Sequence, residues 1–227
     1  MKKINVNGDI IPNDYAVFYQ WYDMDYTCPA DIQAVLDSLE YNEELTVQIN
    51  SGGGDVVSGQ EIYSMLRKIS GSHKVIVEIE SIAASAASMI AMAGSVVRMS
   101  PVALLMIHNA SCTASGDYKV FMHNAAVLET VNAAIRAAYI EKTGMDDDEL
   151  TAMMDYETWL TANQCVEKGF ADEIIRDHEP AIVTNAMVGQ LSLTQEMIET
   201  AKNEMKKEKE LEAKKAEILS DLDKFGV

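Results

Sequence analysis

The feature that most constrains the fold of this chain is a run of small residues at positions 81–94, Ser-Ile-Ala-Ala-Ser-Ala-Ala-Ser-Met-Ile-Ala-Met-Ala-Gly. The run follows a strand-like segment, Val75–Ile79. An ordinary core helix carries large apolar residues along one stripe. Here small side chains let backbones approach closely and leave room for a substrate. The run predicts either a tightly packed Ala/Ser helix on a sheet, or a reactive turn from strand to helix at the positive end of the helix dipole.

The pattern of apolar residues predicts alternating strands and helices. Strands are expected at 4–11, 45–50, 74–79, 96–99, 103–108 and 172–175. Helices are expected at 29–39, 57–69, 81–94, 118–143, 147–154 and 161–168, and residues 15–22 suit a strand or a short helix. This alternation indicates an α/β fold with right-handed crossovers.

The composition changes near residue 180. Residues 192–225 are rich in Glu, Lys, Ala, Met and Leu and contain neither Pro nor Gly, which predicts one long helix. Such a helix is either solvated and partly disordered, or a coiled-coil or partner contact. We therefore expect one domain at 1–180 and a charged helical tail at 181–227.

Charge and cysteine content exclude several classes of function. The 227 residues carry a net charge of −18, which argues against a nucleic-acid partner. The sequence shows no signal peptide and no apolar run of the roughly 18 residues that a transmembrane helix needs, so no membrane partner is expected. Three widely spaced cysteines predict neither a zinc site nor disulfides, and Cys112 and Cys165 suit buried positions. We expect a cytoplasmic protein that uses no metal and no cofactor.

Three features suggest a nucleophile, a base and an oxyanion hole. Ser88 lies in the small-residue run, His108 ends an apolar strand, and the triple glycine 52–54 ends another. A serine needs a neighbouring imidazole to take its proton, and the tetrahedral intermediate needs hydrogen-bond donors at its oxygen. A carboxylate should orient the imidazole. The acidic residues available for this are Asp155, Glu157 and Asp172.

The chain resembles the ClpP-type serine peptidases, and within them the branch encoded by phages and prophages. The resemblance covers roughly residues 5–178 and rests on four blocks that occur in the family's order. The blocks are Ile49-Asn50-Ser51-Gly52-Gly53-Gly54, Ala86-Ala87-Ser88-Met89, Met106-Ile107-His108, and Trp159-Leu160-Thr161-Ala162 with residues 166–172.

The resemblance implies a role for each matching residue. Ser88 would be the nucleophile, His108 the general base and Glu157 the third member of the triad, with Asp155 as its alternative. The oxyanion donors would be the backbone N–H groups of Gly54 and Met89, while Gly52 and Gly53 would form a loop that binds the substrate backbone. Ser81 and Ser85 are expected to be small packing residues. The sequence departs from the family at two of these positions, since Glu157 replaces an aspartate and Gly52 replaces a proline.

The resemblance also implies a ClpP/crotonase-like fold, a repeated β-β-α spiral in which 118–143 is a long handle helix. Members form homo-oligomeric rings, as heptamers or stacked rings, and hydrolyse peptide bonds. In the phage branch the implied substrates are capsid or scaffold proteins, cleaved during head maturation. Three alternatives stay open: a housekeeping ClpP peptidase that works with an AAA+ unfoldase, an acyl-CoA enzyme on the same fold, and a catalytically dead structural ring.

Overall fold

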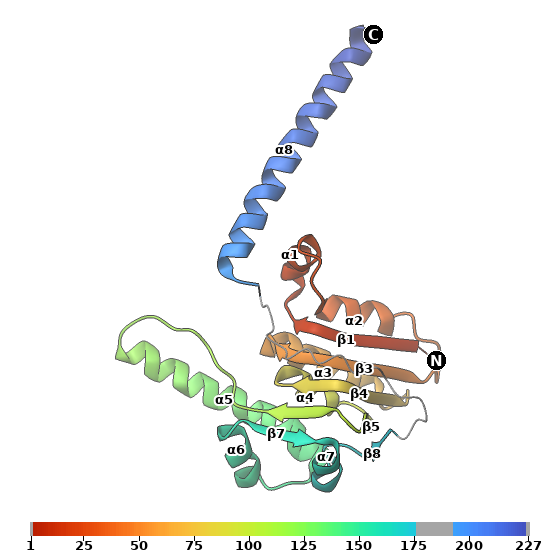
Figure 1. Cartoon of the computed structure of the whole chain (residues 1–227), viewed down its shortest axis with the longest axis vertical. Coiled ribbons are helices and arrows are strands. Elements are labelled where there is room, and N and C mark those ends of the chain that lie inside the picture. Colours follow the sequence, from red (N-terminus) through yellow and green to blue (C-terminus); the bar gives the residue numbers. More distant parts are fainter. Residues whose placement is uncertain (1, 176–192, 226–227) are drawn as a thin grey trace. The chain divides into compact units, whose positions relative to one another are not determined.

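The structure is a computed structural model that describes residues 2–175 and 193–225. The chain separates into two compact units (Figure 1). The first comprises residues 1–16 and 25–187, and the second comprises residues 17–24 and 188–227. The domain boundary expected near residue 180 falls at 176–192, outside the described residues.

The described residues form mostly strands and helices. The strands are β1 (Lys2–Ile10), β2 (Tyr26–Thr27), β3 (Leu45–Gly54), β4 (Val75–Ala84), β5 (Val96–Met99), β6 (Leu104–Ile107), β7 (Thr158–Thr161) and β8 (Glu173–Ile174). The helices are the 3-10 turn η1 (Asn13–Tyr15), α1 (Ala16–Trp21), α2 (Pro29–Leu36), α3 (Val56–Ile69), α4 (Ala86–Ala91), α5 (Tyr118–Thr143), α6 (Asp147–Asp155), α7 (Ala162–Lys168) and α8 (Gln195–Phe225). The predicted α/β class is confirmed.

The eight strands form one sheet that divides at β4. The order is β2-β1-β3-β4-β5-β8, with parallel pairing throughout. The first part of β4, residues 76–79, pairs with β5, whereas its last part, residues 82–84, pairs with β6. β7 then pairs antiparallel with β6. This division brings the end of β4 beside β6, and both strands lead into the functional site.

The small-residue run is not one helix. The strand expected at 74–79 continues to Ala84, the chain turns at Ser85, and the helix comprises only Ala86–Ala91. The prediction of a helix over 81–94 is therefore wrong in its first five residues and its last three. The physical reason is long-range pairing, because β6 offers β4 a second neighbour beyond the end of β5.

Helix α5 has the bounds that the sequence predicts, because both of its ends are capped. The Asp117 carboxylate accepts hydrogen bonds from the amides of Lys119 and Val120. Gly144 ends the helix in the left-handed conformation, with a φ of 68°.

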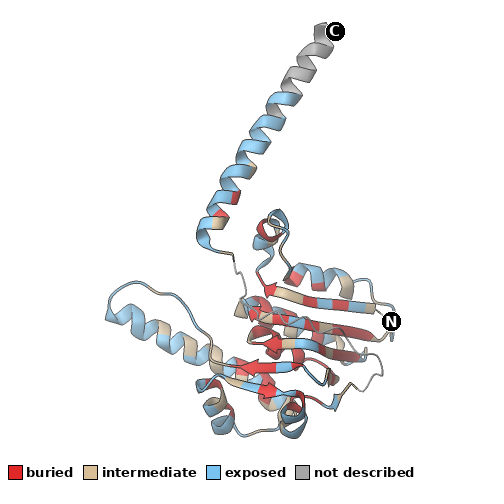
Figure 2. Ribbon diagram, in the orientation of Figure 1, coloured by how far each residue is buried: buried red, intermediate tan, exposed pale blue. Residues whose placement is uncertain are grey.

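The core lies around the central strands and the helices that pack on them. Figure 2 shows buried residues concentrated along β3 and β4, which are largely covered on both faces, as parallel strands usually are. The largest fully buried side chains are Tyr139 of α5 and Phe170, whose rings meet edge to face at 5.8 Å. Cys165 is buried as expected, but Cys112 is exposed, because it lies in the irregular segment before α5.

The second unit has a small apolar core of its own. Phe18 of α1 packs against Ile198 and Ala201 of α8, and the Tyr22 hydroxyl donates to the Met197 carbonyl. No helix in the described ranges 2–175 and 193–225 has the length and apolarity to cross a membrane.

Candidate active site

Ser85 occupies a strained turn between β4 and α4. Its φ of 55° and ψ of −125° lie in a region that residues other than glycine rarely adopt, at a cost of about 1–3 kcal/mol. The Ser85 amide donates to the Met106 carbonyl of β6 at 3.0 Å, which fixes the turn to the neighbouring strand. A sharp strand-to-helix turn of this kind presents a serine hydroxyl above the sheet.

His108 faces this serine. Its Nε2 atom lies 2.8 Å from the Ser85 Oγ atom, within hydrogen-bond distance. The contact follows from the sheet, because Ala84 pairs with Met106, so that β4 and β6 end side by side. Ser85 and His108 are both half-buried. The 2.8 Å between Nε2 and Oγ is a distance at which a general base can take the proton of a hydroxyl.

Ser88 does not meet His108, and the prediction that it would is wrong. Ser88 is fully buried inside α4, with an exposed fraction of 0%. Its Oγ atom donates to the Ser85 carbonyl at 2.6 Å and lies 2.8 Å from the Tyr139 hydroxyl. Ser85, expected to be a packing residue, holds the position beside the imidazole, because α4 begins one residue after it and Ser88 lies a turn further along.

Glu157 lies on the other side of the imidazole. Its Oε2 atom is 3.9 Å from His108 Nδ1, and its Oε1 atom accepts a hydrogen bond from Trp159. The antiparallel pairing of Ile107 with Thr158 places the two residues opposite each other. Glu157 has a φ of 48°, a second strained backbone at this site. The 3.9 Å separation is an ion-pair distance, and catalytic hydrogen bonds are often long in the absence of substrate.

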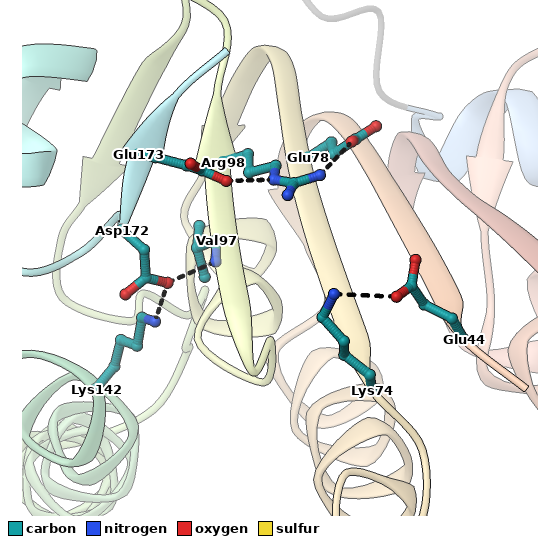
Figure 3. Close-up of polar contacts among 8 residues, drawn as sticks. All are labelled: Glu44, Lys74, Glu78, Val97, Arg98, Lys142, Asp172 and Glu173. Carbon is teal, nitrogen blue, oxygen red and sulfur yellow. Dashed lines mark hydrogen bonds and ion pairs between the residues drawn. The ribbon is translucent and has the colours of Figure 1, made fainter. Parts of the chain in front are cut away.

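The other two acidic residues have different contacts. Asp155 Oδ1 accepts a hydrogen bond at 2.7 Å from the side-chain Nδ2 of Asn109, the residue that follows His108. Asp172 accepts hydrogen bonds from the Val97 amide and from Lys142 Nζ, each at 2.7 Å (Figure 3). The Asp172 carboxylate therefore joins β5 to α5. In the same view Arg98 lies between Glu78 and Glu173, which marks this part of the sheet as a structural ion-pair cluster.

Gly53, rather than Gly54, lies against the serine. A Cβ atom on Gly53 would come within 2.6 Å of Ser85 Cβ, whereas one on Gly54 would meet the Ile10 backbone of β1 at 2.2 Å. Gly53 has a φ of 100°, which favours glycine. Its amide donates to Ser51 Oγ at 3.1 Å. Gly52 and Gly53, expected in a loop, lie in the last residues of β3.

The amide next to the serine belongs to Ala86. The Met89 amide, expected to bind an oxyanion, donates instead to the Ser85 carbonyl at 3.4 Å as part of α4. Ala86 is the first residue of that helix, so its N–H has no carbonyl four residues earlier within the helix to bond. The Ala86 nitrogen lies 3.0 Å from the position of a Cβ on Gly53. Gly53 therefore lies close to the Ala86 amide as well as to Ser85.

The space beside these groups is small in this conformation. A cavity of about 10 Å³, enough for roughly one water molecule, opens between α4 and α5. It is lined by Val56, Ser85, Ala86, Met89, His108, Ala110, Ile135 and Tyr139. At this site a hydroxyl lies next to an imidazole, and the imidazole lies next to a carboxylate. These are the groups that nucleophilic acyl transfer uses.

The sequence contains the motif Ala-Ala-Ser twice, at 83–85 and 86–88. Residue types alone do not distinguish the two serines. No pattern within the run makes that distinction, because it depends on where β4 ends, and the pairing of Ile82–Ala84 with β6 places the turn at Ser85.

Comparisons with known proteins show which family the chain resembles. The sequence profile of the Clp protease family matches residues 27–178. The ATP-dependent Clp protease proteolytic subunit of Bacteroides fragilis is 29% identical over 142 residues, which cover 62% of this chain and 68% of the relative. Subunit 2 from Treponema denticola is 29% identical over 147 residues, 64% of this chain and 72% of the relative. Subunit 1 from Chlamydia muridarum is 30% identical over 145 residues, 62% of this chain and 74% of the relative.

The profile match includes β3, β4, β6 and β7, the four strands whose ends carry the site. The α/β sheet agrees with the ClpP-like fold that the sequence predicts. On these grounds, the chain belongs to the Clp protease family.

Proposed function

We propose that this chain is a serine endopeptidase in which Ser85 is the nucleophile, His108 the general base and Glu157 the third member of the triad. The observation that carries the proposal is the 2.8 Å contact between His108 Nε2 and Ser85 Oγ. Family membership supports peptide-bond hydrolysis, and this contact supports Ser85 as the nucleophile.

The acylation step follows from the positions of these groups. Nε2 of neutral His108 accepts the Ser85 hydroxyl proton while Oγ attacks the scissile carbonyl, and the imidazolium then gives that proton to the leaving amine. For Nε2 to act as acceptor, Nδ1 must carry the other ring proton, and Nδ1 faces Glu157. The carboxylate therefore orients the ring and stabilises its charged form. Water later hydrolyses the acyl-enzyme by the reverse proton path.

The oxyanion would be bound by backbone amides. The Ala86 N–H lies next to the nucleophile, as the amide that follows a nucleophilic serine does in other hydrolases. Gly53 would supply a second donor after its amide leaves Ser51 Oγ, a rotation that a glycine at this position permits.

The first prediction separates the two serines. Ser85→Ala should abolish fluorophosphonate labelling and lower kcat/KM for a peptide substrate by at least about 10³-fold. Ser88→Ala should still be labelled because the nucleophile is intact, although the rate of labelling should be lower. Mass spectrometry of the labelled, assembled protein identifies the modified serine. A label on Ser88 would contradict the assignment, and a wild-type protein that takes no label would favour the dead structural ring.

The second prediction concerns the acid. Glu157→Gln should lower kcat by at least about tenfold, because an amide supports the imidazolium less well than a carboxylate does. Asp155→Asn is the matched control, and its amide oxygen can still accept the Asn109 hydrogen bond. Steady-state kinetics on one substrate compare the two variants. The reverse ranking would move the role to Asp155.

The third prediction tests the close approach at the nucleophile. Gly53→Ala should lower kcat/KM by about 10²-fold or more, because its Cβ would displace Ser85 and the nearby amide donors. Gly71→Ala is the control, since a Cβ there has no heavy atom within 4 Å. Circular dichroism should show both variants folded. Unchanged kinetics of Gly53→Ala would show that this approach is not required.

We propose that the protein acts as a cytoplasmic homo-oligomeric ring, either a heptamer or stacked rings. Exposed apolar side chains on the first half of α5 support an oligomer contact there, since large exposed apolar patches commonly mark interfaces. They are Tyr118, Val120, Phe121, Met122 and Val127.

For the biological role we propose the processing of phage capsid or scaffold proteins during head maturation. Helix α8 supports this role, because it lies outside the profile match at 27–178 and provides a long charged segment for docking on a partner. The alternative is a housekeeping peptidase that receives unfolded protein from an AAA+ unfoldase, as the names of the ATP-dependent relatives suggest.

A reconstitution distinguishes these two roles. The full chain, mixed with capsid and scaffold precursors encoded by the neighbouring genes, should yield discrete products without ATP or an unfoldase. The Ser85→Ala variant should yield none. Gel electrophoresis and mass spectrometry follow the products. Cleavage that requires an added AAA+ unfoldase and ATP would support the housekeeping role instead.

A further inference from the structure

Two buried hydroxyl groups lie directly behind the nucleophile and take no part in the proton transfer. Ser88 of α4 has an exposed fraction of 0%, and Tyr139 of α5 one of 1%. Their oxygens are 2.8 Å apart, and Ser88 Oγ is also 2.6 Å from the Ser85 carbonyl. Buried polar groups cost free energy unless they are paired, and here the pairing leads to the backbone of Ser85.

The direction of these hydrogen bonds is determined by the number of protons. A carbonyl only accepts, so Ser88 uses its single hydroxyl proton on the Ser85 carbonyl. It must then accept the proton of the Tyr139 hydroxyl. Burial raises the pKa of Tyr139 well above its ordinary value, which keeps that hydroxyl protonated and able to donate.

The Ser85 carbonyl is held by three donors. Besides Ser88 Oγ, the backbone amides of Ser88 and Met89 donate to it at 3.0 and 3.4 Å. The peptide that contains this carbonyl also contains the Ala86 N–H. Because a trans peptide is planar, its C=O and N–H point in opposite directions, and fixing one fixes the other. The contacts behind Ser85 therefore determine the direction in which the Ala86 N–H points.

We propose that Tyr139 and Ser88 are positioning residues that hold the Ser85–Ala86 peptide so that the Ala86 N–H is directed at the oxyanion. The inference rests on the proposed function of Ser85 as the nucleophile. Tyr139 donates to Ser88, and Ser88 donates to the Ser85 carbonyl. Because these hydrogen bonds run in one direction, each polarises the next, and the Ala86 N–H becomes a stronger donor. The benefit falls on the transition state, where negative charge develops on the oxygen.

The test compares Ser88→Ala, Tyr139→Phe and the double variant. Ser88→Ala removes the hydroxyl at the carbonyl and should lower kcat about tenfold or more with KM almost unchanged. It should weaken inhibition by a peptide boronate, which forms a tetrahedral adduct with the nucleophile, by the same factor. Tyr139→Phe leaves the Ser88 hydroxyl in place and should lower kcat only a fewfold. The double variant should be as slow as Ser88→Ala alone.

Comparing Tm with kcat distinguishes a positioning role from a merely structural one, in which the two quantities would change together. Ser88→Ala leaves the Tyr139 hydroxyl buried without its partner, so its Tm should fall. The double variant removes both hydroxyls and should regain part of that Tm, because deleting both partners costs less than deleting one. Its kcat should not recover. If kcat rises with Tm in the double variant, or if the single variants change only KM, the inference is overturned.

The control is Tyr63→Phe, which removes a tyrosine hydroxyl that contacts α5 at Glu141, away from Ser85. It should leave kcat unchanged, and light scattering should show the same assembly size for every variant. Failure of the proposed function would look different, because Ser85→Ala would then keep activity or the wild type would take no label. A labelled wild type and an inactive Ser85→Ala, together with wild-type kcat in Ser88→Ala and Tyr139→Phe, would overturn this inference alone.

Discussion

The hydrogen bond from the Ser85 amide to the Met106 carbonyl is the contact on which the site depends. It ties the end of β4 to β6 at the point where β4 has left β5. The left-handed backbone of Ser85 would be unfavourable in an isolated peptide, and it persists because this bond and the three donors at the Ser85 carbonyl determine both of its peptide planes. A helix can then begin at Ala86 while the hydroxyl stays above the sheet.

Strand register supplies the other groups of the site without any long loop. In β3, Ser51 pairs with Ala83, so the glycines that follow it reach the serine. Parallel pairing of β6 with β4 ends beside the same turn and delivers His108. Antiparallel pairing of β7 with β6 returns the chain so that Glu157 faces the imidazole from the far side. Each of these residues is thus next in the chain to a paired strand residue: Ser85 to Ala84, His108 to Ile107 and Glu157 to Thr158. The paired strands hold these residues more firmly than a free loop would.

The sequence predicted the features that local patterns determine. Asp117 and Gly144 bracket α5, and the apolar strand that ends at His108 is recognisable from its neighbours alone. The sequence analysis expected Ser88 beside His108, whereas the structure has Ser85 there. The difference depends on where β4 ends, which is determined by pairing with a strand 22 residues later, Ile82 with Leu104. Gly54 was favoured over Gly53 for a related reason, since only the tertiary contact shows which glycine meets Ser85 and which meets Ile10.

The two serines illustrate how position within one turn of helix separates chemical roles. Ser85 lies before the first residue of α4, where its hydroxyl is half-buried and reaches an imidazole. Ser88 lies inside the helix, and a serine there bonds back to an earlier carbonyl, in this case that of Ser85. Such a side-chain bond to an earlier carbonyl usually destabilises a helix slightly. In the mechanism we propose, the carbonyl that it reaches belongs to the peptide that presents the Ala86 N–H, so this local contact affects the reaction. Tyr139 completes the arrangement, because it supplies the partner without which a fully buried hydroxyl would destabilise the core.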